Sequence, residues 1–366
     1  MQSHWVMLES PQTKQAAKSM RILLTGHQGY IGSILAPMLV TAGYDVVGLD
    51  SGLFDPCVYS GTPVTIPSIT KDVRDIDLGD VQNFDAVLHL AGLSNDPLGD
   101  LNPELTLDIN YRATVRLAEL SKKAGVQRFI FSSSCSTYGA AGNDFLNEES
   151  EFNPVTPYGQ SKVFAEQELA LLADDSFSPT YLRNATAYGV SPRLRFDLVV
   201  NNLTAWAFTT HQVYLKSDGS PWRPIVHIAD ISRAFIAALE APREVVHNAA
   251  FNVGRNDENF RIREIADLVA QIVPNCDVSF APDAGPDTRN YRVDCSKISQ
   301  QLPNFSAAWT AQKGISELYE TYVANGLKLD DFEGETFSRI KYLRSRMADG
   351  TIGEDLRLAE RQAAHA

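Results

Sequence analysis

Short apolar runs alternate with stretches of helical periodicity along the first half of the chain. The apolar runs have the length of buried strands and occupy residues 21–24, 44–50, 84–92, 127–131 and 180–183. Apolar side chains recur at helical spacing in the stretches between them, namely residues 31–39, 104–124 and 158–172. Strands that alternate with helices predict an α/β fold built on a doubly wound parallel sheet. Ligands of such sheets bind at the carboxyl ends of the strands.

The pattern changes near residue 190 and indicates four parts of the chain. A loose polar tail, a large-sheet domain, a smaller mixed α/β lobe and a charged helical extension are predicted at residues 1–20, 21–190, 191–330 and 331–366. A strand and a helix near residues 228–270 are expected to return to the large sheet, so the two domains are interleaved. The extension is expected to pack on the surface or on a partner subunit. The start of the protein stays open, because Met20 follows the polar tail.

The first strand runs directly into a glycine-rich segment, Thr25-Gly26-His27-Gln28-Gly29-Tyr30-Ile31-Gly32. In a strand–turn–helix unit, Gly26 allows the tight turn, Gly29 lets the backbone approach a pyrophosphate, and Gly32 lets the helix pack on the strand. The free N–H groups at the start of that helix, around Tyr30 and Ile31, attract phosphate. A glycine turn without a ligand is the alternative, and the flanking strand and helix disfavour it.

The next strand ends in Asp50, about 20 residues after the glycine segment, where dinucleotide-binding (Rossmann) folds place an acid on a ribose 2′-hydroxyl. A carboxylate at this position repels a 2′-phosphate, and no arginine follows Asp50 closely. The sequence therefore predicts that residues 21–190 bind NAD rather than NADP.

The composition of the 366-residue chain narrows its possible partners. A net charge of −13 disfavours nucleic acid and anionic membranes, and it requires local arginines for any anionic substrate. No apolar run reaches the roughly 18 residues of a membrane span, and residues 1–20 lack the apolar core of a signal peptide. The four cysteines include no Cys-x-x-Cys pair, and the seven histidines show no metal-ligand spacing. We expect reduced thiols, no metal site and a cytoplasmic location.

Candidate chemistry lies in Tyr158 and Lys162, which are four residues apart and share one face of a predicted helix. A lysine beside a tyrosine favours the phenolate and lowers the pKa of the tyrosine toward working pH. Ser134 follows the predicted strand 127–131, so its hydroxyl can hydrogen-bond the substrate oxygen that Tyr158 deprotonates. The alternatives are two surface residues one helical turn apart and a serine turn that satisfies its own backbone.

Together, the TGxxGxxG pattern of Thr25–Gly32, Ser134 and Tyr158-x-x-x-Lys162 resemble the extended short-chain dehydrogenase/reductase superfamily. Within it, residues 20–325 are similar to the nucleotide-sugar epimerase/dehydratase family, which includes UDP-galactose 4-epimerase. The resemblance implies that Tyr158 is the general base, that Lys162 positions the cofactor ribose and tunes Tyr158, and that Ser134 shares the reacting hydroxyl.

The resemblance also implies further contacts to the cofactor. Asp72-Val73 is similar to the pair that holds the adenine, and Leu90-Ala91-Gly92 to the turn beneath the cofactor. Asn110 stands where the family keeps an asparagine that supports the active-site hydrogen-bond network. The alternative for Asn110 is an amide on the helix surface.

The substrate site that the resemblance implies is less complete. Asn202, expected in a loop, and Arg223 match positions that hold the diphosphate in the family. Arg289 is a second candidate for phosphate, with a solvated charge as an equal alternative. A guanidinium suits phosphate because its fork matches two oxygens. The other substrate-binding candidates are Ser136, Asn184 and Thr186.

Two departures from the family pattern bear on the reaction. Dehydratases of the family have an acidic pair just after the serine or threonine, where this chain has Cys135 and Ser136. A 4,6-dehydratase is therefore disfavoured. A 3,5-epimerase of the family uses a cysteine one position later than Cys135, so we interpret Cys135 as a small core residue.

The sequence therefore favours an NAD-dependent nucleotide-sugar epimerase acting at C4, through transient oxidation to a keto-sugar and return of the hydride. The alternatives are a nucleotide-sugar dehydrogenase or ketoreductase, a 3,5-type epimerase and a non-catalytic NAD-binding protein. The partner is a nucleoside-diphosphate sugar whose nucleotide, sugar and inverted carbon stay open. Relatives usually dimerise through the helices that match residues 104–124 and 160–172, so a homodimer is expected.

Overall fold

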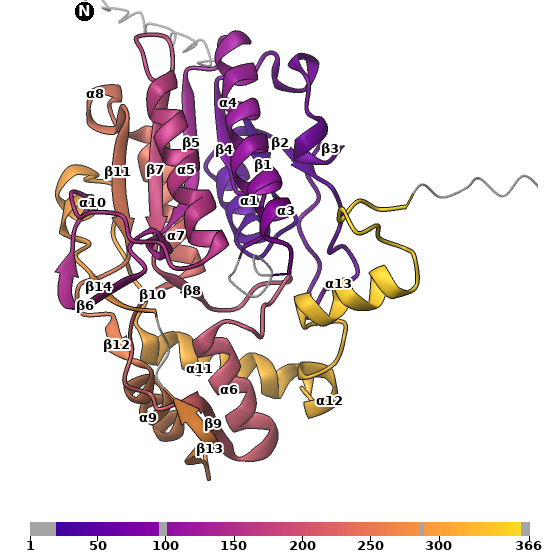
Figure 1. Ribbon diagram of the computed structural model, residues 1–366, viewed down its shortest axis with the longest axis vertical. Coiled ribbons are helices and arrows are strands. Elements are labelled where there is room, and N and C mark those ends of the chain that lie inside the picture. The colour runs from indigo at the N-terminus through magenta and orange to yellow at the C-terminus, as the bar shows by residue number, and fades with distance from the viewer. Residues whose placement is uncertain (1–19, 95–100, 286–288, 360–366) are drawn as a thin grey trace, which may run out of the picture.

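A large parallel sheet forms the centre of the molecule. The computed structural model describes residues 20–94, 101–285 and 289–359, and within these the sheet has seven strands: β1 (Arg21–Thr25), β2 (Asp45–Asp50), β3 (Ser68–Thr70), β4 (Ala86–His89), β5 (Arg128–Ser134), β7 (Ser178–Asn184) and β11 (Ala249–Val253). All neighbouring strands are parallel, in the order β11-β7-β5-β4-β1-β2-β3 (Figure 1). The predicted doubly wound α/β fold is confirmed. The predicted N-terminal tail lies outside the described residues, apart from Met20.

Side chains of β5 alternate between two cores, one on each face of the sheet. Phe129 and Phe131 belong to the core that includes residues of α4 (Ala113–Lys123) and α5 (Pro157–Leu172). Ile130 belongs to the opposite core, with residues of α1 (Gly32–Thr41) and α7 (Ile228–Glu240). A strand covered on both faces consists of continuous apolar residues, which explains why the sequence pattern locates it.

The strand order reverses at β1, which pairs with β2 on one side and with β4 on the other. At such a reversal the connections leave the sheet toward opposite faces, and a crevice opens at the carboxyl ends of the strands. The glycine segment begins at this point of the chain, directly after β1.

The helix predicted over residues 104–124 contains a π-helical segment. Its first part, α3 (Pro103–Leu107), continues through η3 (Asp108–Arg112) into α4. Such π segments are rare and occur often at functional sites. In this chain the segment carries Asn110, whose side chain is 1% exposed.

A second lobe lies below the carboxyl edge of the sheet (Figure 1). Its buried core joins helices that include α6 (Val199–Thr210), α9 (Ile262–Ile272) and α11 (Ala311–Asn325), of which α11 was not predicted. Further helices and strands outside the large sheet are β6 (Ala140–Leu146), β8 (Thr186–Tyr188), β9 (Gln212–Ser217), β10 (Trp222–His227), β12 (Asn259–Arg261), β13 (Asp277–Gly285), β14 (Asn290–Val293) and α12 (Leu329–Phe332), together with α8 (Arg243–Val246) and α10 (Ser296–Gln301), which pack on the large sheet. Across the described ranges, no helix has the length and apolar character needed to cross a membrane.

Helix α6 begins earlier than predicted, so Asn201 and Asn202 are helical and the loop expected there is wrong. The reason lies in the two amide side chains, which bond back to the preceding segment. Asn201 Nδ2 donates to Arg195 O at 2.9 Å, and Asn202 Nδ2 donates to Phe196 O at 2.8 Å. These bonds fold residues 195–202 into a compact helix entry, which residue preferences alone do not indicate.

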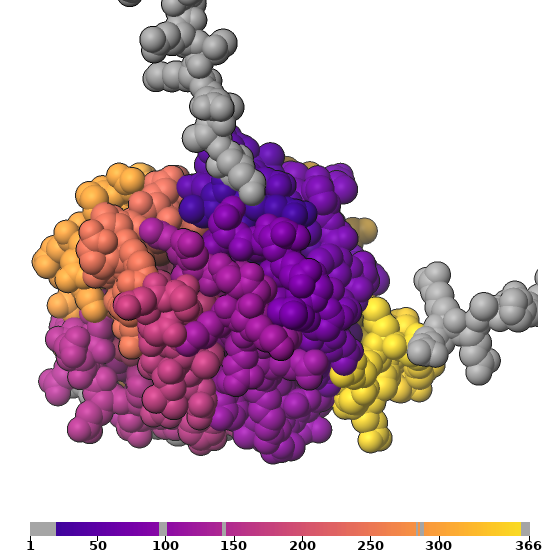
Figure 2. Space-filling view, turned by 90° about the horizontal axis from the view of Figure 1, so that it is seen from above, coloured from indigo at the N-terminus to yellow at the C-terminus, as the bar shows by residue number. Residues whose placement is uncertain are grey.

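The C-terminal extension packs on the chain's own sheet domain. Its helix α13 (Arg339–Ala348) and the following turn contribute Leu343, Ile352 and Leu356 to the same core as Val73. Figure 2 shows the extension (yellow) on the flank of the sheet domain. These three side chains are therefore buried within the chain itself, and no contact with a partner subunit is needed to bury them.

Candidate active site

A cavity of about 710 Å³ opens at the carboxyl ends of the central strands, between the sheet and the second lobe. Its volume falls in the range of roughly 300–1,000 Å³ that is typical of small-molecule sites. All site residues predicted from the sequence line this cavity, except Asn110. The sequence motifs and the fold therefore point to the same place.

The glycine segment forms a tight backbone cradle at one end of the cavity. Gly26 has a φ of +72°, and a Cβ added there would lie 2.7 Å from Ala91 N. A Cβ on Gly32 would lie 2.2 Å from Gly26 O. The space is therefore open to backbone N–H groups at the start of α1 and closed to side chains, which is the arrangement that holds a diphosphate.

Asp50 and Tyr30 are fixed by different neighbours beside this cradle. Asp50 Oδ2 accepts from Gln28 N at 3.1 Å and Oδ1 accepts from Gly52 N at 3.0 Å, so its carboxylate stays at the end of β2. Tyr30 directs its hydroxyl away, donating to Gly189 O at 2.6 Å. The backbone of Tyr30, rather than its phenol, is thus available to a phosphate.

Asp72 and Val73 lie near the same end of the cavity. Asp72 Oδ1 accepts from Arg74 N at 2.9 Å and caps the short helix η1 (Val73–Asp75). Its Oδ2 pairs with Arg74 Nη2 at 2.7 Å. Burial raises the pKa of Asp72, but the bonds from Arg74 outweigh burial and lower the pKa overall. Asp72 therefore places a carboxylate at this end of the cavity, and Val73 places an apolar side chain beside it.

His89, at the end of β4, joins the cradle to the π segment. Thr114 Oγ1 donates to Asn110 O at 2.8 Å, so it accepts from His89 Nε2 at 2.7 Å. His89 Nδ1 then accepts from Thr25 Oγ1, also at 2.7 Å. This order of donors requires the neutral imidazole with its proton on Nε2.

We expect His89 to make stability depend on pH. Burial lowers the pKa of His89 to about 3, and the charge on Lys162 acts in the same direction. In the unfolded chain the pKa of His89 is about 6.5, so below this pH the unfolded state takes up a proton that the folded state does not bind. The contribution of His89 to the free energy of unfolding is therefore complete above this pH. It decreases as the pH is lowered, by about 2 kcal/mol between pH 7 and pH 5. Urea unfolding of the wild type and of His89→Gln at both values measures the effect, and an equal pH dependence in both proteins would contradict it.

Asn110 does not line the cavity but supports its wall. Its Oδ1 accepts from Leu93 N at 2.7 Å, and its Nδ2 donates to Leu93 O at 2.8 Å and to Ser161 Oγ at 3.3 Å. These bonds connect the turn after β4 to α5. The alternative of a helix-surface amide is wrong, because the π segment turns Asn110 inward.

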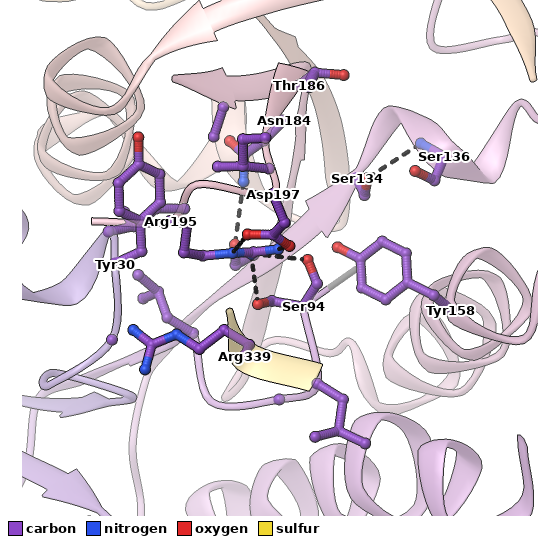
Figure 3. Close-up of a pocket in the computed structure, with 18 of the residues that line it drawn as sticks. Tyr30, Ser94, Ser134, Ser136, Tyr158, Asn184, Thr186, Arg195, Asp197 and Arg339 are labelled. Atoms are coloured by element: carbon purple, nitrogen blue, oxygen red, sulfur yellow. Dashed lines mark hydrogen bonds and ion pairs between the residues drawn. The ribbon is translucent and has the colours of Figure 1, made fainter. Parts of the chain in front are cut away.

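Tyr158, Lys162 and Ser134 meet at the cavity from two elements. Figure 3 shows Tyr158 on α5 facing the end of β5, where Ser134 lies. Lys162 Nζ donates to Ser132 O at 2.9 Å and lies 5.7 Å from the centre of the Tyr158 ring. Burial lowers the pKa of Lys162 to about 8. A cation held beside a phenol in this way favours the phenolate.

A buried ion pair lies directly behind these residues. Glu166 and Arg183 are 4% and 6% exposed, and Arg183 Nη2 lies 2.7 Å from Glu166 Oε2. Arg183 Nε is 3.1 Å from both carboxylate oxygens, and Ser133 Oγ donates to Oε1. The pair therefore holds Ser133, the neighbour of Ser134, against α5.

Cys135 is fully buried and turned away from the cavity. Its Sγ donates to Arg183 O at 3.2 Å. Burial raises the pKa of the Cys135 thiol, which disfavours the thiolate. These features agree with the interpretation of Cys135 as a core residue.

The predicted substrate residues form the far part of the cavity. Asn184 Nδ2 donates to Ser132 Oγ at 3.1 Å, while its Oδ1 is buried without a partner. Thr186 begins β8, and Ser136 N donates to Ser134 Oγ at 3.1 Å. Asn202 Nδ2 donates to Phe196 O, which leaves the amide oxygen and the second N–H of the side chain for a ligand.

Arg223 and Arg289 lie together at the opening toward the second lobe. Arg223 is 6% exposed, and its Nη1 donates to Trp222 O at 2.8 Å and to Arg289 O. Arg223 thus fixes the backbone that carries Arg289. Both arginines line the cavity, where a guanidinium can bind phosphate oxygens.

Sequence reasoning missed a polar cluster in the middle of the cavity. Arg195 Nη2 pairs with Asp197 Oδ2 at 2.6 Å, and Arg195 Nη1 donates to Ser94 Oγ at 2.8 Å (Figure 3). Arg339 reaches the same cavity from α13. The alternating charges in Arg193-Leu194-Arg195-Phe196-Asp197 could have drawn attention to residues 193–197, whereas nothing in the sequence near Arg339 indicated a site.

The glycine cradle, the acid after β2 and the serine–tyrosine–lysine set define a dinucleotide-dependent site of the short-chain dehydrogenase/reductase type. The chain belongs to the NAD-dependent epimerase/dehydratase family, whose model matches residues 22–254. NAD is therefore its cofactor, and the open cradle and the position of Asp50 fit this molecule.

Similar proteins catalyse different reactions on nucleotide sugars. UDP-glucuronic acid decarboxylase 1 of Arabidopsis thaliana is 25% identical over 333 residues, covering 87% of this chain and 73% of that protein. UDP-glucose 4-epimerase of Bacillus subtilis (strain 168) is 27% identical over 329 residues, covering 82% and 94%. The solved structure of MoeE5 in complex with UDP-glucuronic acid and NAD has a TM-score of 0.72 and 26% identity, covering 84% of this chain and 100% of that chain. The names of these relatives thus describe different reactions, and the MoeE5 structure contains NAD.

Proposed function

We propose that the protein is an NAD-dependent nucleoside-diphosphate-sugar epimerase that inverts C4 of the sugar. The observation that carries this proposal is the Ser134–Tyr158–Lys162 set, which faces the same cavity as the glycine cradle and the arginines of the second lobe. Cys135 and Ser136 provide no carboxylate for the elimination of water. The similarity to UDP-glucose 4-epimerase supports the choice of C4.

Each residue of the set has one task in the proposed reaction. Tyr158 accepts the proton of the sugar hydroxyl, and Ser134 hydrogen-bonds the same oxygen. Lys162 holds positive charge beside the Tyr158 phenolate. NAD, when bound, supplies the acceptor for the hydride of the reacting carbon and returns it. Arg223 and Arg289, with Asn202, bind the diphosphate and leave the sugar free to turn between the two transfers.

The test is NMR of the purified protein with UDP-, GDP-, dTDP- and CDP-sugars, including UDP-glucuronic acid, without added cofactor. Appearance of the C4 diastereomer of one sugar supports the proposal, because the hydride must then have returned to the same sugar. The substrate is identified by the same spectrum.

Other outcomes contradict the C4 epimerase. Turnover that requires added NAD(H), with a stoichiometric absorbance change of the nicotinamide, indicates a dehydrogenase or ketoreductase. Inversion at C3 or C5 indicates a 3,5-type epimerase, and release of carbon dioxide from UDP-glucuronic acid indicates a decarboxylase. No reaction with any sugar, while NAD still binds, favours a non-catalytic protein.

We also propose that the protein is a homodimer formed through the continuous helix α3–η3–α4 and through α5. On α5, Phe164 and Leu171 are 40% and 79% exposed and lie seven residues apart on one face. Phe164 also contacts Tyr111 of η3, with ring centres 5.6 Å apart. Light scattering at micromolar concentration is expected to give a dimer, and Phe164→Glu a monomer. A monomeric wild type would contradict the proposal.

We propose a cytoplasmic location. All four cysteines are free thiols, and Cys57, Cys135 and Cys295 are buried. Free thiols are typical of reducing compartments. Fractionation of cells that express the protein tests this location.

A further inference from the structure

A charged side chain of the C-terminal extension reaches the active-site cavity. Arg339 is the first residue of α13, is 5% exposed and lines the cavity (Figure 3). The family model ends at residue 254, so this residue comes from a part of the chain that the match does not include. Nothing in the proposed reaction uses it.

Arg339 contacts the Cys57 thiol but has no ion-pair partner in the described part of the chain. Its Nη1 is buried without a hydrogen-bond partner, and among the described residues no carboxylate lies within ion-pair distance of its side chain. Its Nη2 has a long contact of 3.5 Å to Arg193 O. A buried charge without compensation is unfavourable, so this position calls for an anion.

The surroundings of Arg339 do not supply that anion. Burial lowers the pKa of Arg339, and the nearby Arg195 and Arg193 act in the same direction, whereas Cys57 and Asp197 raise it. The Asp197 carboxylate is already paired with Arg195, with Nη2 2.6 Å from Oδ2. The net charge of the whole chain is −13, so this concentration of buried arginine is local. A ligand with adjacent negative charges, such as a diphosphate, would meet this charge.

The position of Arg339 favours the cofactor over the sugar nucleotide. Its guanidinium lies 4.3 Å from the centre of the Phe54 ring. Phe54 belongs to the loop that follows Asp50, and Arg193 Nη1 donates to Phe54 O at 2.7 Å. Arg223 and Arg289, in contrast, belong to the second lobe. Arg339 is thus associated with the dinucleotide end of the cavity.

The rest of the extension is attached to the elements that surround this end. Arg74, the ion-pair partner of Asp72, donates from Nη1 to Asp355 O at 2.9 Å. Arg357 pairs with Asp75, with Nη2 2.9 Å from Oδ1. Between them, Leu356 lines the cavity with a φ of +58°, a backbone conformation that is unfavourable for leucine. The turn holds this side chain at the cavity despite that cost.

We propose that Arg339 binds the diphosphate of NAD and that residues 339–358 form a strap that retains the cofactor. The proposal rests on the family's cofactor and holds whichever sugar is the substrate. It predicts slow exchange of NAD, which suits a reaction without net redox change.

The test compares Arg339→Ala with Arg344→Ala in the full chain after removal of NAD. Arg344 lies on the same helix, is exposed and does not line the cavity, so it controls for loss of charge from α13. Calorimetry measures binding of NAD and, separately, of UDP. Because Arg339→Ala loses a charged contact to phosphate, its affinity for NAD is expected to be roughly ten- to hundredfold lower than that of the wild type. Arg344→Ala should bind NAD as the wild type does, and Arg339→Lys should be intermediate because it keeps the charge without the fork.

Two further measurements show whether the variants fold and whether Arg339 contacts NAD or the sugar nucleotide. Thermal unfolding without NAD shows whether Arg339→Ala is folded, and the lysine variant gives the answer if it is not. Release of bound NADH, followed by the change in its own fluorescence, should be faster in Arg339→Ala than in the wild type. Unchanged NAD affinity and release in both Arg339 variants would overturn the proposal. A loss confined to UDP would also overturn it, because the arginine would then serve the substrate.

Discussion

Replacement of Tyr158 by phenylalanine is expected to lower kcat by roughly 10²–10⁴-fold, the usual contribution of a general base. The substitution removes only the hydroxyl that faces Ser134 and leaves the ring beside Lys162. NAD binding should persist, since the glycine cradle and Asp50 are unchanged. Kinetics with the sugar nucleotide identified by NMR, together with the NAD content, measure both effects.

Tyr111→Phe is the matched control for this experiment. Tyr111 lies on η3, packs against Phe164 and does not line the cavity, so it should retain wild-type kcat. A decrease of less than tenfold in Tyr158→Phe would show that another group accepts the proton. A loss of NAD from the same variant would instead indicate a structural role for the hydroxyl.

Arg183→Met is expected to have the largest effect on stability. The substitution leaves the Glu166 carboxylate buried, 4% exposed, without the guanidinium that now binds both of its oxygens. Breaking a buried pair on one side typically costs about 3–5 kcal/mol. Urea unfolding at pH 7 measures the loss. Activity should fall as well, because Ser133 is bonded to Glu166 and is adjacent to Ser134.

The double variant Arg183→Met, Glu166→Leu separates the pair from simple packing. It removes both charges, so it should be more stable than Arg183→Met alone, since apolar replacement of both partners of a buried pair is often tolerated. If the double variant lost as much stability as the sum of the two single variants, the two residues would be energetically independent, and the ion pair would not explain the effect.

The sequence was sufficient for the large sheet because its central strands are buried on both faces. β1, β4 and the first part of β5 each contain an uninterrupted apolar run, which leaves little room for another interpretation. Short edge elements such as β3, β8 and β12 have three residues each, which is too short for a periodic pattern. The start of α6 was misplaced because Asn201 and Asn202 are held by carbonyl groups of the preceding turn.

By itself, the sequence determined those parts of the site in which spacing along the chain is also geometry in space. A glycine turn between strand and helix, and Tyr158 one helical turn before Lys162, are local arrangements that the chain specifies directly. The tertiary structure alone decided what distant segments add. Arg195 contacts Ser94 from 101 positions away, and Arg339 enters the cavity from the C-terminal extension. No local pattern encodes such contacts, because they arise only when the extension and the second lobe bury their apolar side chains against the sheet domain.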